Sequence, residues 1–253
     1  MYLWMCPIGK NFFLPALALI YILSFFPETG KAATKYNVVK VTNGGGISGT
    51  VKFVGDVPQI EMFSVDKDEE VCGHEPKPSE ELIISKDKGI KNVFVYIKKI
   101  ASGKSFKKQS RNFVSNQNNC RFDPHILIVP TGARVDLLNN DNVLHNLHSW
   151  SAKNKPFNQG TTFGQVLTRE FKWKERIMVT CDIHSWMSSW IIVVGNPYFA
   201  LTDEKGKFNI DNIPAGSYEL IAWQETLGRK KKKVNINANE EAEVKFEYTP
   251  KKK

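Results

Sequence analysis

The sequence lacks the patterns of a helical protein and has little cysteine or histidine. Of 253 residues, four are cysteine and five are histidine. Apolar residues almost never recur at helical spacing beyond the N-terminus, and short runs rich in β-branched and aromatic residues recur instead between turn residues. Hydrophobic residues make up 42% and charged residues 24%, which excludes general disorder. The composition predicts an all-β globular protein.

Motifs of several common function classes are also missing. No Cys-x-x-Cys-His occurs, which excludes covalently attached haem. No His-x-His pair occurs, so the additional coppers of multicopper oxidases are not expected. The chain has no nucleic-acid-binding motif and no recognisable nucleophile–His–acid arrangement. We therefore expect a carrier or sensor, with no nucleic-acid partner and no enzymatic activity.

Long apolar runs are scarce, and the single one lies at the N-terminus. Lys10 precedes an apolar run over residues 12–26, and Gly30-Lys31-Ala32 supplies the small residues that a signal peptidase reads. Residues 1–32 are therefore predicted to be an export signal. An uncleaved anchor is the alternative, disfavoured because the run is shorter than the roughly 20 residues of a membrane span.

Cleavage has consequences for charge and location. The signal carries two lysines and one glutamate, so its loss reduces the formal net charge from +9 to +8. A basic surface favours acidic partners. We expect a periplasmic or otherwise exported protein with no integral membrane segment after cleavage.

Three cysteines remain in the predicted mature chain, and an odd number leaves one thiol to explain. Cys72 and Cys120 lie in polar segments and are expected to form a disulfide. Closing a loop of about 48 residues contributes about 3–4 kcal/mol in the chain-entropy model. The alternative is a second metal site in which these two thiolates join His74 and His125.

The expected strands are short and recur with turn residues between them, which is typical of β-sandwiches. They cover residues 47–54, 92–98, 125–129, 134–138, 166–171, 177–181, 190–194, 207–210, 217–223, 232–236 and 243–248. The character of the sequence changes near residues 195–197. Residues 64–90 receive no assignment, and residues 100–120 are expected to be a polar surface connection.

Soft metal ligands gather in the heptapeptide Cys181-Asp182-Ile183-His184-Ser185-Trp186-Met187. A thiolate, an imidazole and a thioether follow one another at three-residue spacing, between two predicted strands. His145 or His148, in an expected loop upstream, can supply a further imidazole. Two His and one Cys with a weak axial Met form the known environment of an electron-transfer copper.

The same segment resembles the cupredoxins, and its Cys-x-x-His-x-x-Met spacing is most similar to amicyanin. The resemblance covers about residues 112–195 and includes 122–124, 128–132, Val135, 139–141 and the pair His145-Asn146. It implies a Greek-key β-sandwich that binds one copper per chain. The implied ligands are His145, Cys181, His184 and Met187.

The resemblance also implies roles around these ligands. Asn146 matches the residue that ties the two ligand loops together, His148 matches a non-ligand position, and the imidazole edge of His184 is expected to be exposed as the electron exit. Asp182 and Ser185 depart from the family pattern, which leaves the potential and spectral type open. Zinc binding and a site that has lost its copper are alternatives.

Two further features allow both a functional and a structural interpretation. Trp150, Trp186 and Trp190 form either an apolar rim around the copper loop or ordinary core. The basic run 229–233 either docks an acidic partner or is a solvated hairpin, and the second interpretation is favoured.

The flanks of this region resemble a second family. Residues 202–208 and 213–220 resemble the carboxypeptidase regulatory-like, transthyretin-like module, and 47–51 match its first strand. Residues 45–99 and 197–249 are therefore expected to form one small β-sandwich that encloses the cupredoxin region 112–195 in sequence. The whole chain resembles bacterial exported proteins labelled methylamine utilization proteins, a label that establishes no role in amine oxidation here.

The leading functional hypothesis is one-electron transfer with a redox partner protein, an acidic cytochrome or oxidoreductase being the expected kind. Copper storage, sensing or delivery without electron transfer is the first alternative. A surface interaction module with vestigial copper is the second.

Overall fold

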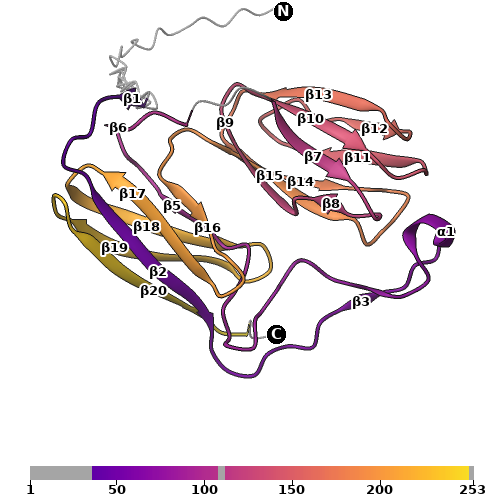
Figure 1. Cartoon of the computed structure of the whole chain (residues 1–253), viewed down its shortest axis with the longest axis horizontal. Coiled ribbons are helices and arrows are strands. Elements are labelled where there is room, and N and C mark those ends of the chain that lie inside the picture. The colour runs from indigo at the N-terminus through magenta and orange to yellow at the C-terminus, as the bar shows by residue number, and fades with distance from the viewer. Residues whose placement is uncertain (1–35, 108–111, 251–253) are drawn as a thin grey trace, which may run out of the picture. The chain divides into compact units, whose positions relative to one another are not determined.

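The computed structural model describes residues 36–107 and 112–250 (Figure 1). The export signal predicted over 1–32 lies outside these residues. Regular structure in the described ranges is nearly all β, as predicted, with the single-turn helix α1 (Glu69–Cys72). Within the same ranges no helix has the length and apolar character of a membrane span.

Residues 113–194 form one β-sandwich, here called the contiguous sandwich. Its sheets have the strand orders β13-β10-β7-β8 and β12-β11-β14-β15-β9. Two of its pairings are parallel, β10 with β7 and β15 with β9. Its strands are β7 (Phe113–Gln117), β8 (Phe122–Asp123), β9 (Ile126–Pro130), β10 (Ala133–Asn139), β11 (His145–Trp150), β12 (Asn158–Thr161), β13 (Val166–Phe171), β14 (Glu175–Thr180) and β15 (Ser188–Val194).

Alternation along the strands builds the core between these two sheets. Successive side chains point to opposite faces of a sheet. In β10 the fully buried residues Val135 and Leu137 alternate with more exposed neighbours, and in β14 Ile177 and Val179 do the same. These side chains join one apolar cluster that also includes Cys181 and Met187. The core therefore ends directly at the predicted ligand loop.

Strands from both ends of the described chain form a second sandwich, here called the split sandwich. Its sheets have the orders β16-β5-β18-β19 and β17-β2-β20. Its strands are β2 (Gly45–Phe53), β5 (Phe94–Ile97), β16 (Phe199–Leu201), β17 (Lys207–Ile213), β18 (Gly216–Gln224), β19 (Gly228–Ile236) and β20 (Glu241–Tyr248). The contiguous sandwich lies between the two halves in sequence.

The parallel pairing of β2 with β20 joins the two halves over eight residue pairs, from Gly46 opposite Glu241 to Phe53 opposite Tyr248. At Gly49 the paired strand β20 passes so close that a Cβ atom would collide with the carbonyl oxygen of Val244. Glycine is therefore required at this point of the strand.

The segment between β2 and β5 leaves the split sandwich as a long excursion (Figure 1). It carries β3 (Met62–Phe63), α1 and β4 (Lys77–Pro78), while β1 (Asn37–Val38) and β6 (Ser102–Gly103) form a separate short pair. Val65 and Cys72 are buried in the core of the contiguous sandwich. Part of residues 45–99, expected to belong to the split sandwich, thus packs on the other one.

The two sandwiches also share a small apolar cluster of Phe94, Ile126, Ile192, Val194 and Trp223. Beside it, the carboxylate of Glu225 accepts hydrogen bonds from the His125 ring at 2.6 Å and from Trp190 Nε1 at 2.6 Å. Apolar and polar contacts together connect the sandwiches.

Strand β7 was not expected, because its sequence is polar. Residues 100–120 were predicted to be a surface connection, which is wrong for 113–117. Ser115 and Gln117 point inward and are buried. The Gln117 side-chain amide donates to Leu138 O and Thr161 Oγ1, both at 3.0 Å. These two bonds satisfy the amide nitrogen and offset the cost of burying it.

Candidate metal site

The ends of two paired strands bring the predicted ligands together. His145 is the first residue of β11, in a strand rather than the expected loop, and Cys181 directly follows β14. These strands are antiparallel neighbours, with His148 opposite Thr180. His184 and Met187 lie in the short loop between β14 and β15.

Backbone hydrogen bonds hold this loop closed. The Cys181 N–H donates to Met187 O at 3.1 Å, and the Met187 N–H donates to His184 O at 3.0 Å. Met187 is buried next to these bonds, with 1% of its surface exposed. These backbone bonds and the buried Met187 side chain define the shape of the loop.

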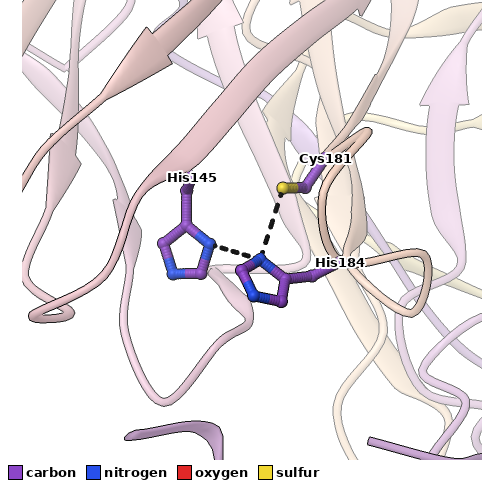
Figure 2. A group of neighbouring side chains, drawn as sticks. All are labelled: His145, Cys181 and His184. Atoms are coloured by element: carbon purple, nitrogen blue, oxygen red, sulfur yellow. Dashed lines mark hydrogen bonds between the residues drawn. The ribbon is translucent and has the colours of Figure 1, made fainter. Parts of the chain in front are cut away.

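The side chains of His145, Cys181 and His184 point toward one another (Figure 2). The two Nδ1 atoms are 2.9 Å apart, and Cys181 Sγ is 3.7 Å from His184 Nδ1. One nitrogen or sulfur atom of each residue lies within 4.8 Å of those of the other two. Both histidines are fully buried.

Each imidazole is held at its other nitrogen by a carboxylate. His145 Nε2 is 2.9 Å from Asp141 Oδ2, and His184 Nε2 is 2.8 Å from Asp68 Oδ2. An ionised carboxylate only accepts hydrogen bonds, so both Nε2 atoms carry hydrogen. Asp141 also accepts the backbone N–H groups of Asn119 and Cys120, at 2.7 and 2.8 Å.

These tautomers decide whether the site fits a metal ion. In the neutral rings both Nδ1 atoms carry lone pairs, and these lone pairs face each other at 2.9 Å beside a sulfur atom. Their repulsion is relieved by a cation, which is either a proton on the His145 ring or a metal ion held by all three donors. A carboxylate bonded to the remote nitrogen of a ligating imidazole is the usual support of metal-bound histidine. The residues therefore fit a soft or borderline metal ion.

The electrostatics of the donors agree with this fit. Burial lowers the pKa of His145, but its hydrogen bonds with Asp141 and Cys181 outweigh burial and raise the pKa to about 9. Burial raises the pKa of the Cys181 thiol, whereas hydrogen bonds from His145 and the Asn146 backbone bring it below its ordinary value. Burial is the main cause that lowers the pKa of His184. The pocket thus favours a thiolate beside positive charge.

Asn146 connects the two ligand-bearing segments. Its side-chain oxygen accepts the Asp182 N–H at 2.5 Å, and its amide nitrogen donates to Asp182 Oδ2 at 3.0 Å. Asp182 also accepts a hydrogen bond from His148 Nδ1 at 2.9 Å, and this bond is the main cause that lowers the pKa of Asp182. His148 therefore lies outside the donor set.

The remaining cysteines form the expected disulfide, Cys72–Cys120, and Cys181 is a free, buried thiol. The alternative second metal site is not formed. His74 is exposed and bonds Glu69 at 2.8 Å, while His125 bonds Glu225 at the contact between the sandwiches. No disulfide sulfur is available to either histidine as a thiolate.

The three tryptophans do not make a common rim. Trp186 is buried, its ring lies 5.1 Å from that of His184, and its Nε1 donates to Cys120 O. Trp150 is exposed and stacks on His148 at 4.0 Å. Trp190 packs against Trp223 at the contact between the sandwiches. The basic run 229–233 is exposed on β19.

The expected exposure of the His184 imidazole is wrong. The ring is fully buried and its outer nitrogen is bonded to Asp68. Sequence reasoning missed both carboxylates. Asp141 lies in the Asn139-Asn140-Asp141 motif, four residues before His145. This short separation could have marked Asp141 as a neighbour of the His145 ring. Asp68 is 116 positions from His184, and no local pattern marks it.

Comparison with known proteins found matches to parts of the chain. The family model described as polysaccharide lyase family 4, domain II, matches residues 177–244. This range runs from β14 to β20 and so includes parts of both sandwiches. The chain has no match among curated proteins.

Solved structures resemble part of the chain. A Cu-containing nitrite reductase from Thermus scotoductus SA-01 is 19% identical over 36% of this chain and 24% of its own, with a TM-score of 0.32. A purple cupredoxin from Nitrosopumilus maritimus is 21% identical over 33% of this chain and 100% of its own, with a TM-score of 0.29. A mutant of amicyanin in its reduced Cu(I) form is 16% identical over 35% of this chain and 87% of its own, with a TM-score of 0.32.

The chain thus spans about a quarter of the nitrite reductase that it matches. None of these likenesses assigns a function, which has to come from the site itself. The fold class is all-β, a cupredoxin-like β-sandwich with a further β-sandwich, as the sequence predicts. The transthyretin-like character of the split sandwich stays a prediction.

Proposed function

We propose that this protein binds one copper ion per chain and carries single electrons in an exported compartment. The observation that carries the proposal is the convergence of His145 Nδ1, His184 Nδ1 and Cys181 Sγ, with both outer nitrogens held by carboxylates. Met187 is proposed as the weak axial ligand, because it is buried in the same loop. Two His, one Cys and an axial Met suit copper in both oxidation states.

The residues of the chain supply what such a carrier needs. Copper bound there would exchange one electron between Cu(I) and Cu(II). The carboxylates keep each imidazole in one tautomer and orientation, so the donors need little rearrangement. Burial of both histidines excludes water. The free Cys181 coexists with a disulfide in the same chain, which suits a thiol protected by metal in an oxidising compartment.

The test is copper titration of the metal-free protein with visible and EPR spectroscopy. We expect one equivalent of Cu(II) to give a strong visible band from thiolate-to-copper charge transfer. Cys181→Ser should abolish the band, because a hydroxyl is a poor substitute for a thiolate. His74→Gln is the control, since it removes an exposed imidazole outside the donor set and should keep the band. A wild-type protein that stays colourless with stoichiometric Cu(II) would refute the proposal.

Copper storage or delivery without electron transfer is the second candidate. The burial of His184 favours it, because no imidazole edge reaches the surface. Stopped-flow oxidation of the copper-loaded protein by ferricyanide separates the two. Rapid one-electron oxidation supports the carrier, and a reaction limited by copper release supports storage.

The partner is proposed to be an acidic redox protein, because the predicted mature chain is basic, with a formal net charge of +8 once Lys10, Lys31 and Glu28 are removed from the +9 of the full sequence. Attraction between opposite charges weakens in salt. Electron exchange with an acidic cytochrome should therefore slow as ionic strength rises, and exchange with a basic cytochrome should not.

A further inference from the structure

We propose that Asp68 is a positioning residue of the metal site, and that residues 62–72 form a cover that seals the outer edge of His184. These residues are called the cover segment. The inference rests on the proposed function for its metal and on the hydrogen bond between Asp68 Oδ2 and His184 Nε2 for its geometry.

The cover segment accounts for the burial of His184. The imidazole is fully buried, whereas the side chain of Asp68 is 41% exposed. One carboxylate oxygen thus bonds the ring at 2.8 Å, and the carboxylate itself reaches solvent. Asp68 is therefore the outermost group between this imidazole and water.

Anchors on both sides fix Asp68 in place. Three residues before it, Val65 is buried in the core of the contiguous sandwich. Four residues after it, Cys72 is joined to Cys120. The carbonyl of Asp68 accepts the N–H groups of Val71 and Cys72, at 2.9 and 2.8 Å. Its backbone is left-handed, with φ 52°, a conformation that Asp tolerates better than most residues.

The disulfide connects the cover segment to Asp141, the carboxylate that holds His145. Cys120 donates its N–H to Asp141 Oδ2 at 2.8 Å, and the same oxygen bonds His145 Nε2. Cys120 also accepts the hydrogen bond from Trp186 in the ligand loop. The two carboxylates that orient the two imidazoles are therefore connected through Cys72–Cys120.

The charge of Asp68 has a predictable effect on the metal. A carboxylate bonded to a ligating imidazole increases the electron donation of the ring. Its negative charge favours the more positive, oxidised state, so it lowers the reduction potential. Asp68→Asn keeps an acceptor oxygen but removes the charge, and Asp68→Ala removes both. The pair of variants separates charge from closure.

The first experiment needs no metal. Metal-free protein is treated with diethyl pyrocarbonate, and acylation of each histidine is followed by peptide mass spectrometry. His74, whose side chain is 74% exposed, serves as the internal reference. In the wild type His184 should react far more slowly than His74. Asp68→Ala should accelerate His184 by about tenfold or more, because a hydrogen bond to a charged group is lost.

Asp66→Ala is the matched control, because Asp66 is exposed in the same segment and should leave His184 protected. Cys72→Ser/Cys120→Ser, which releases the anchor, should also accelerate His184. Circular dichroism verifies that each variant is folded, and Asp68→Gly, which also removes the carboxylate and suits the left-handed backbone at this position, substitutes if Asp68→Ala is not. Equal His184 reactivity in the wild type and in the folded Asp68→Ala variant would overturn the cover.

The second experiment is voltammetry of the copper-loaded protein. Asp68→Asn should raise the reduction potential, and Asp66→Asn should leave it unchanged. An unchanged potential in Asp68→Asn would overturn the positioning role. The labelling experiment separates this inference from the proposed function, because a chain that binds no copper still shows whether Asp68 closes over His184.

Discussion

His145 and His184 differ in sequence surroundings but receive the same support, a carboxylate at Nε2 and an Nδ1 directed at Cys181. Because both Nε2 atoms are bonded to carboxylates, Nδ1 is the nitrogen of each ring that can bind a metal ion. Met187, which is proposed as the axial ligand, should differ from these donors, because a long axial thioether contributes little binding energy.

Met187→Gln should therefore keep copper bound but lower the reduction potential, because an amide oxygen is harder than sulfur and favours Cu(II). His145→Ala should instead weaken Cu(II) binding severely, since it removes an imidazole. Copper titration and voltammetry of both variants beside wild type measure these effects. An unchanged potential in Met187→Gln would identify Met187 as core packing alone.

At the scale of elements, the sequence predicts strands wherever apolar side chains alternate, and it fails where polar side chains are buried. β10, β14 and β20 follow the alternation closely, whereas β7 does not, because Ser115 and Gln117 face inward. The site shows the same limit. Cys181, His184 and Met187 share one loop and could be predicted, whereas Asp68 is brought there only by tertiary structure.

The pairing of β2 with β20 gives a test of the split sandwich. Gly49→Ala should destabilise the protein by about 1–3 kcal/mol, because the new methyl group collides with the Val244 carbonyl. Gly46→Ala is the control in the same strand, since its Cβ meets nothing closer than 3.7 Å. Urea unfolding measures both, and equal stabilities would contradict this register.

The disulfide predicts a definite thiol count. Metal-free protein, purified aerobically and denatured without reductant, should show one titratable thiol in the predicted mature chain, from Cys181. Peptide mapping should link Cys72 to Cys120. Cys72→Ser/Cys120→Ser should lose about 3–4 kcal/mol of stability in the chain-entropy model. Three free thiols would contradict the bridge.

At the scale of the whole molecule, a buried ion pair connects the two sandwiches. The side chains of His125 and Glu225 are only 3% and 7% exposed. Burial lowers the pKa of His125, but the hydrogen bond and charge of Glu225 outweigh burial and raise it above the ordinary value. Because the folded pKa is raised, protonated His125 stabilises the folded state at low pH.

This stabilisation should be complete below about pH 6.5, the unfolded pKa of histidine, and should be lost as pH rises through the folded pKa. The difference in unfolding free energy between wild type and His125→Gln should therefore be largest in mild acid, at about 1.5–3 kcal/mol, and shrink in alkali. Urea unfolding across this range measures it. His74→Gln, at an exposed pair, should show almost no effect, and a pH-independent His125 difference would contradict the assignment.

The split sandwich also determines the order in which the chain can fold. β2 emerges early during synthesis or export, but both of its neighbours, β17 and β20, follow the entire contiguous sandwich. Until they arrive, β2 has unpaired edges of the kind that promote aggregation. A contiguous sandwich that folds first shortens the loop that must be closed. Chains that stop before β20 should therefore leave β2 partly unpaired, even when the ligand loop is complete.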